Sequence, residues 1–115
     1  MTLTPYQFGR WGEYAASFLY IVKFHKILAR RFKTKCGEID IICKKHNIII
    51  FVEVKSRKKD YDEILCSTKQ QKRIVRTAEY FISHNPWYLN YDLRFDLVLI
   101  KPYSFPLLIK NFIVI

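Results

Sequence analysis

The chain has few cysteines, and their arrangement excludes the usual cysteine-based frameworks. Cys36, Cys43 and Cys66 are odd in number and match no Cys-x-x-Cys spacing, so neither a disulfide framework nor a structural zinc site is indicated. We interpret all three as small hydrophobic residues, buried or half-buried, in a reducing compartment. A composite zinc site that also uses one of the three histidines stays open.

Long apolar runs are missing as well. The longest uncharged apolar stretches, 14–22 and 47–52, are far shorter than the roughly 20 residues that a membrane-spanning helix needs. The beginning of the sequence has neither the basic start nor the apolar run of a signal peptide. We therefore expect a cytoplasmic protein with no membrane partner.

Acidic residues are much fewer than basic residues. The chain has 20 Lys and Arg against 10 Asp and Glu, a formal net charge of +10. Such an excess indicates a polyanionic partner, most commonly nucleic acid. Half of the residues are apolar and 17% are aromatic, which excludes intrinsic disorder. A length of 115 residues fits one domain, 1–115, with no repeat and no low-complexity linker.

A first helix is predicted from Pro5 to about Val22. Thr4 is a good N-cap, proline suits the first helical position, and Gln7 completes a capping box. The apolar residues at helical spacing, which we expect on one face, are Phe8, Trp11, Ala15, Phe18, Leu19 and Val22.

Small residues surround the only acid of this helix. Gly9, Gly12 and Ala16 remove bulk around Glu13. Each glycine lowers helix stability by about 1 kcal/mol, so the pair needs a packing or functional reason. We expect another part of the molecule to approach the helix near Glu13.

The rest of the chain predicts a mixed sheet flanked by helices, in the α/β class. The expected elements, in chain order, are a basic edge strand within 23–35, a hairpin of strands 38–43 and 48–55, a loop at 56–67, a helix from 68 to about 83, a strand at 94–100 and a final strand or pairing segment at 107–115. Asp96 is expected to have a structural role, holding Arg94 or a backbone turn.

The hairpin carries charged residues within otherwise apolar strands. Side chains alternate along a strand, so Glu53 and Lys55 share one face. The register across the hairpin sets Asp40 opposite Phe51, Val52 or Glu53. The two carboxylates therefore converge and repel each other unless a cation lies between them; Mg²⁺ suits such oxygen ligands. Lys55 would position a water or stabilise the charge of a phosphorane-like transition state.

A simpler interpretation is open for the same residues. Glu53 and Lys55 would form an ion pair on an exposed hairpin, with Asp40 at the surface, an arrangement that is common and contributes well under about 1 kcal/mol. The apolar character of both strands favours the metal-site interpretation, because strands of this kind belong in the middle of a sheet.

Two segments resemble the YraN family: Gly-Glu-Ile-Asp-Ile-Ile at 37–42 and Phe-Val-Glu-Val-Lys-Ser-Arg at 51–57. The resemblance extends over nearly the whole chain, through the first helix, the segment 68–72 and the segment 94–98. It implies a restriction-endonuclease-like fold of the PD-(D/E)XK superfamily, close to archaeal Holliday junction resolvases. The usual glycines after the first helix and after Lys55 are absent, and the tail differs, which affects loops and the C-terminus.

The resemblance assigns roles to individual positions. Asp40, Glu53 and Lys55 match the superfamily's catalytic acids and lysine, and Glu13 matches a helix acid that completes a metal site with them. Gln70 matches a glutamine near the site; from its spacing to Ile74 it faces the sheet, although a capping contact at the helix start explains it equally well. The implied cofactor is Mg²⁺ or Mn²⁺.

The basic residues flank this site in sequence and would hold a phosphodiester backbone without reading bases. The residues expected to bind nucleic acid are Arg30, Arg31, Lys33, Lys35, Arg57, Lys69, Lys72, Arg73 and Arg76, together with Lys58 and Lys59. No helix-turn-helix, zinc-finger or RNP motif is present, so recognition of structure is favoured over recognition of sequence.

Three functional hypotheses follow. The first is a metal-dependent, structure-selective nuclease-like enzyme, with DNA favoured over RNA as its partner. The second is a non-catalytic nucleic-acid-binding module of the same fold. The third is an assembly protein that forms a homodimer through an edge strand within 105–115, which is apolar enough to pair.

Overall fold

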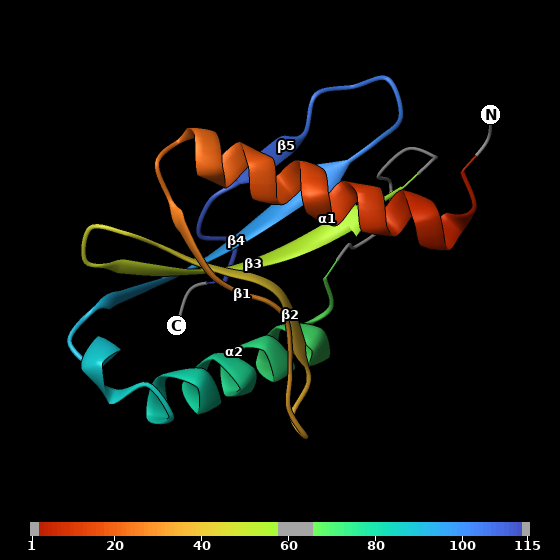
Figure 1. Ribbon diagram of the computed structural model, residues 1–115. Coiled ribbons are helices and arrows are strands. Elements are labelled where there is room, and N and C mark those ends of the chain that lie inside the picture. The colour runs from red at the N-terminus through yellow and green to blue at the C-terminus, as the bar shows by residue number, and fades with distance from the viewer. Residues whose placement is uncertain (1–2, 58–65, 114–115) are drawn as a thin grey trace.

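The computed structural model describes residues 3–57 and 66–113. Five strands form one sheet between two helices, with α1 on one face and α2 on the other (Figure 1). The elements are α1 (Pro5–Val22), β1 (Lys26–Lys33), β2 (Glu38–Lys45), β3 (Ile48–Ser56), α2 (Thr68–Ser83), a short 3₁₀ helix η1 (Pro86–Tyr88), β4 (Asp92–Ile100) and β5 (Leu107–Ile109).

The sheet is mixed, and its strands lie in chain order from β1 to β5. The pair β3–β4 is parallel, with α2 as the crossover, and the other three pairs are antiparallel. The sequence prediction of an α/β fold with a central mixed sheet flanked by helices is confirmed, and the architecture is consistent with a restriction-endonuclease-like fold. Among the described residues, no helix is long and apolar enough to cross a membrane.

Each face of the sheet has its own apolar core, as the alternation of side chains requires. Ile50 and Val52 of β3 pack on the α1 side, and Phe51 between them packs on the α2 side. Full burial of a side chain such as Phe51 contributes about 1.5–3 kcal/mol. The buried residues of α2 lie on the side of the helix that faces the sheet and include Ile74 and Phe81.

Helix α1 begins where the sequence predicts, with both hydrogen bonds of the capping box between Thr4 and Gln7. Its buried face, however, differs from the prediction. Trp11 and Phe18 are 51% and 65% exposed, and the residues that face the sheet are Phe8, Gly12, Ala16, Ser17 and Tyr20. The physical reason is the close approach at Gly12, where an added Cβ would overlap the Ser56 hydroxyl of β3.

Strand β5 ends early, although the chain after it stays beside β4, where the Phe112 N–H donates to the Phe95 carbonyl over 2.8 Å. The predicted final strand at 107–115 is only three residues long, Leu107–Ile109. Asn111 then takes a left-handed backbone conformation with φ 56°, and its N–H donates to Asp96 Oδ1 over 3.0 Å.

One further prediction needs correction, because Cys36 is exposed rather than buried or half-buried. The loop residues 58–65, with Lys58 and Lys59, lie outside the described part of the chain.

Asp96 has the structural role that the sequence predicts. Its carboxylate is fully buried and accepts two hydrogen bonds of 2.9 Å from Arg94, one from the Nε and one from an Nη. The Tyr20 hydroxyl donates to the same carboxylate over 2.7 Å. With the Asn111 N–H, Asp96 joins β4, α1 and the C-terminal segment in one buried network.

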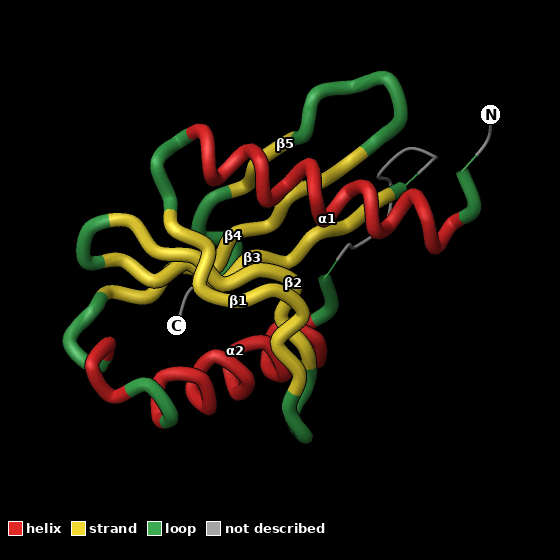
Figure 2. The backbone as a smooth tube through the Cα atoms, viewed as in Figure 1, coloured by secondary structure: helices red, strands yellow, loops and turns green. Residues whose placement is uncertain are grey.

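Strand β2 leaves β3 at Asp40. The β2–β3 register ends at Ile41 opposite Val52, whereas β2 stays paired with β1 to its first residue, Glu38. Ile39 packs on the α2 side and Ile41 on the α1 side, although residues two apart in a regular strand share a face. Figures 1 and 2 show the β1–β2 hairpin bending past the sheet toward α2. The sheet therefore opens between β2 and β3 at this point.

Candidate active site

Asp40 and Glu53 lie together at the opening between β2 and β3. The last register pair is Ile41 opposite Val52, so Asp40 and Glu53 are the next residues on the two strands. Of the three registers that the sequence leaves open, the one that faces Asp40 toward Glu53 is found. The Asp40 Oδ2 accepts the Val54 N–H over 2.8 Å, so its side chain continues the connection between the strands where the backbone ladder stops.

Burial makes Glu53 an unusual carboxyl group. Its side chain lies on the α2 face of β3 and is 9% exposed. Burial raises its pKa well above the usual range of a glutamate, and the hydrogen bond and the charge of the neighbouring Asp40 carboxyl group raise it further. The Lys55 ammonium opposes this shift and lowers the pKa of Glu53, but the raising causes prevail.

Gln70 reaches the acidic pair from helix α2. Its backbone N–H donates to the Oγ of Ser67, the N-cap residue, over 3.1 Å. Its side-chain Nε2 donates to Glu53 Oε2 over 3.2 Å. Both interpretations of this residue are therefore present at once: the backbone takes part in capping, and the side chain contacts the site.

Lys55 lies two residues after Glu53 on the same face of β3 and is half-buried. The charge of its ammonium lowers the pKa of Glu53, so Lys55 acts electrostatically on that carboxyl group. The structure thus brings together Asp40, Glu53, Lys55 and Gln70, four residues that were selected from the sequence.

A cavity of about 240 Å³ opens beside these residues. Its lining residues are Gly37, Glu38, Asp40, Glu53, Gln70, Arg73 and Ile74. Arg73 was assigned from the sequence to the nucleic-acid-binding surface and not to the wall of the site. Its spacing of three residues from Gln70 on α2 is the signal that places both on one helix face.

A second, smaller cavity of about 90 Å³ lies on the α1 side of Asp40. It is lined by Arg10, Glu13, Tyr14, Arg30, Arg31, Asp40 and Ile41. Asp40 therefore borders both cavities, which agrees with its position where β2 crosses from one packing layer to the other. No local sequence pattern indicates that Arg10 and Tyr14 lie here, because their placement depends on the bend of β2.

Glu13 belongs to the smaller cavity and has a cationic partner. Arg31 of β1 donates from Nε to Glu13 Oε1 over 2.9 Å and from an Nη to Oε2 over 3.4 Å. The close approach that Gly9 and Gly12 suggested is made by Ser56 at Gly12; at Gly9 there is open space. Of these two cavities, Glu13 borders the smaller one together with Asp40, and Glu53 borders the larger one.

Comparison with known proteins agrees with the resemblance seen in the sequence. A sequence model of the uncharacterised protein family UPF0102, the family of the YraN proteins, matches residues 12–100. The chain belongs to this family. It is 43% identical over 105 residues to a UPF0102 protein of Rhodopseudomonas palustris strain HaA2, covering 90% of this chain and 82% of the relative.

Two further relatives give the same result. A UPF0102 protein from another strain of Rhodopseudomonas palustris is 46% identical over 105 residues, covering 90% of this chain and 81% of the relative. One from Nitrobacter winogradskyi is 37% identical over 107 residues, covering 92% and 91%. These names give a family and no activity, so the function of the UPF0102 chain has to be inferred from its own site.

The donor atoms at the UPF0102 site are hard oxygens. Two adjacent carboxylates, Asp40 and Glu53, suit a cation such as Mg²⁺, which takes one or two protein carboxylates and completes its coordination with water and phosphate. Within residues 3–57 and 66–113, no three Asp, Glu, His or Cys side chains gather around one point. Glu13 is therefore not assembled with the pair in this conformation.

The basic residues selected from the sequence occupy different environments. Arg30 and Arg31 border the smaller cavity and Arg73 borders the larger one. Arg30 also donates from Nε to Ser17 Oγ over 3.2 Å. The remaining described basic residues of that set, which are all exposed, are Lys33, Lys35, Arg57, Lys69, Lys72 and Arg76.

Proposed function

We propose that this protein is a metal-dependent phosphodiesterase that acts on nucleic acid. The observation that supports it is the buried Glu53 carboxyl group beside Asp40, at an opening of the sheet bordered by arginines. A buried carboxyl group with a raised pKa is destabilising for the fold when ionised, and such groups are concentrated at functional sites. A Glu53–Lys55 ion pair with a purely structural role would explain neither the cavity nor the adjacent position of the two acids.

Asp40 and Glu53 are the residues that would hold Mg²⁺ or Mn²⁺, in agreement with the donor set described above. A bound cation of this kind supplies Lewis acidity at a phosphate and a more acidic bound water. Binding of the cation would require Glu53 to lose its proton, and the cation's charge would remove the repulsion between the two carboxylates.

The surrounding side chains have separate roles in this proposal. Lys55 stabilises negative charge that develops on the phosphate, because its ammonium shares a face of β3 with Glu53 and acts on that carboxyl group through its charge. Gln70 positions Glu53 through its 3.2 Å hydrogen bond. Glu13 would become a supporting ligand only after Arg31 releases it, since Arg31 binds both of its oxygens.

The charge of the site suits a phosphodiester backbone. Arg30 and Arg31 on one side of Asp40 and Arg73 on the other place cations at both entrances. The formal net charge of +10 attracts the polyanion over a longer range. Contacts with phosphates do not distinguish one base sequence from another, so the proposed activity depends on nucleic-acid structure.

A cleavage assay tests the proposal. The purified protein is incubated with branched, flapped, single-stranded and duplex DNA and with RNA, in Mg²⁺, Mn²⁺ or EDTA. We expect cleavage only with a divalent cation, and a loss of at least about 100-fold in Asp40→Asn and in Lys55→Ala. Cleavage that survives in both variants would overturn the assignment.

A non-catalytic nucleic-acid-binding module is the second candidate, and the Glu13–Arg31 ion pair favours it. Arg31 neutralises Glu13, the further acid that borders the smaller cavity together with Asp40. This candidate requires salt-dependent binding that Mg²⁺ does not change. Calorimetric titration with Mg²⁺ separates the two: heat that is lost in Asp40→Asn supports the enzyme, and no heat with intact nucleic-acid binding supports the module.

A further inference from the structure

Two exposed tyrosines and an arginine form an ordered row on α1. Tyr6, Arg10 and Tyr14 are four residues apart, so they follow one another along the helix surface. Arg10 donates from its two Nη atoms to the Tyr6 and Tyr14 hydroxyls, each over 3.2 Å. Its guanidinium carbon also lies 5.7 Å from the centre of the Tyr14 ring.

The fold does not use these rings. Helix α1 packs on the sheet through Phe8, Gly12, Ala16 and Tyr20, whereas Tyr6 and Tyr14 are 68% and 56% exposed. Neither tyrosine belongs to either apolar core. Two large rings held around a guanidinium in solvent therefore need another explanation than packing.

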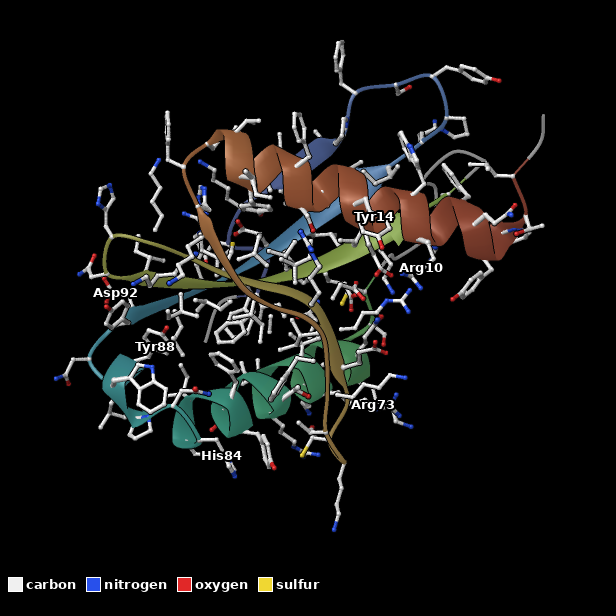
Figure 3. All side chains as sticks on the ribbon, in the orientation of Figure 1. Arg10, Tyr14, Arg73, His84, Tyr88 and Asp92 are labelled. Carbon is white, nitrogen blue, oxygen red and sulfur yellow. The ribbon has the colours of Figure 1, made fainter. Side chains whose placement is uncertain are left out.

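The row lies beside Asp40. Arg10 and Tyr14 line the small cavity that Asp40 also borders, together with Arg30 and Arg31. In Figure 3, Arg10 and Tyr14 project from α1 on the same side of the molecule as Arg73 of α2, and Tyr88 and His84 lie on the opposite side. Arg10, Tyr14 and Asp40 thus border one cavity, and Tyr6 is joined to this group by its hydrogen bond from Arg10.

We propose that Tyr6, Arg10 and Tyr14 form a stacking subsite for unpaired bases of single-stranded nucleic acid. The proposal deepens the proposed function and rests on it for the role of the adjacent acids. Exposed aromatic faces stack on any base, because every base has a π-face, and an arginine between them contributes cation–π contact and charge for the phosphates. Duplex bases already stack on each other and present only their edges and backbone.

The subsite specifies the substrate class more closely. A nucleic acid with an unpaired segment, such as a flap, a gap or a free strand, can place a base on the tyrosines and its backbone between Arg30 and Arg31. A continuous duplex can use only the arginines. We therefore expect single strands and flaps to bind more tightly than blunt duplexes of equal charge.

Fluorescence anisotropy in EDTA tests the subsite without any cleavage. The probes are labelled oligo(dT), oligo(rU) and a blunt DNA duplex of matched charge; the first two distinguish DNA from RNA as the source of the bases. We expect Tyr6→Ala/Tyr14→Ala to weaken single-strand binding about tenfold or more, and duplex binding by less than about twofold. Tyr6→Phe/Tyr14→Phe keeps the rings and is expected to bind within about threefold of the parent chain.

Trp87→Ala is the matched control, since Trp87 is 66% exposed and lies in η1, next to Tyr88 on the far side of the molecule. Circular dichroism checks that each variant is folded. Three results would each overturn the subsite. They are an equal loss of affinity for single strand and duplex in the double alanine variant, no loss of affinity in that variant, and no single-strand binding by the parent chain. Intact binding with no cleavage under any condition would overturn only the proposed enzymatic function.

Discussion

The Asp40 carboxylate accepts the backbone N–H of Val54 over 2.8 Å, at the point where β2 separates from β3. One oxygen of the residue that we place at the centre of the site therefore also joins the two strands. Substitutions of Asp40 act on both roles, and the choice of replacement separates them.

Asp40→Ala is expected to lower the free energy of unfolding by about 1–2 kcal/mol, because the half-buried Val54 N–H loses a charged acceptor. Asp40→Asn keeps an oxygen for that N–H, so its stability should be close to that of the parent chain. Urea denaturation measures both. Equal destabilisation by the two substitutions would show that the hydrogen bond is not what stabilises the opening.

Glu53→Gln is expected to stabilise the metal-free protein increasingly as the pH rises. The folded state raises the pKa of Glu53, so the folded protein binds this proton more tightly than the unfolded chain does. The corresponding stability is fully present below the ordinary glutamate pKa and is lost as the pH rises through the raised value. Glutamine does not ionise and avoids this loss.

The measurement for Glu53→Gln is thermal or urea unfolding in EDTA at acidic and alkaline pH. We expect an advantage on the order of 1–3 kcal/mol at pH about 8 and little difference at pH about 4. A constant difference between the two pH values would mean that Glu53 does not titrate abnormally. Glu79→Gln is a control at an exposed site of α2.

The two glycines of α1 are expected to respond oppositely to alanine. At Gly9 a Cβ meets open space, so Gly9→Ala should stabilise the helix by about 0.5–1 kcal/mol. At Gly12 a Cβ overlaps Ser56 Oγ, so Gly12→Ala should destabilise the protein by about 1–3 kcal/mol.

Ser56→Ala provides the test of the Gly12 contact. Ser56 Oγ is buried without a hydrogen-bond partner in the described structure, so its removal alone should cost little. In the double variant with Gly12→Ala, most of the lost stability should return, because the overlapping atom is gone. A double-mutant cycle in urea measures the coupling, and additive effects would contradict the contact.

Asp96→Ala is expected to destabilise the protein by about 3–5 kcal/mol. The substitution leaves the Arg94 guanidinium, the Tyr20 hydroxyl and the Asn111 N–H without their shared acceptor. The exposed Asp92 at the start of the same strand offers the control, and Asp92→Ala should change stability by less than about 0.5 kcal/mol. Guanidinium unfolding compares the two variants.

Local patterns were sufficient to predict most of the fold. A capping box placed the start of the first helix, and the apolar strands with a short turn predicted a range of hairpin registers that includes the observed one, with Ile41 opposite Val52. Gln70 followed from helical spacing. These features depend on residues that are close in sequence, and for that reason the amino-acid sequence alone predicts them.

Features that depend on distant parts of the chain could not be predicted in this way. The face of α1 was misassigned because its large aromatics show helical spacing, while the close approach of β3 at Gly12 selects a stripe of smaller residues. The pairing of Glu13 with Arg31, and the position of Arg10 at the site, follow from the bend of β2. No local pattern in the sequence encodes that bend.

The short β5 has a consequence for how copies of the chain can associate. An edge strand that is long and apolar is a template on which another chain can add its own strand, and such addition is a common route to aggregation. Here Asn111 diverts the backbone to Asp96 immediately after Leu107–Ile109. A second molecule approaching this edge meets a ladder of three residues, and at the opposite edge it meets the lysines and arginines of β1.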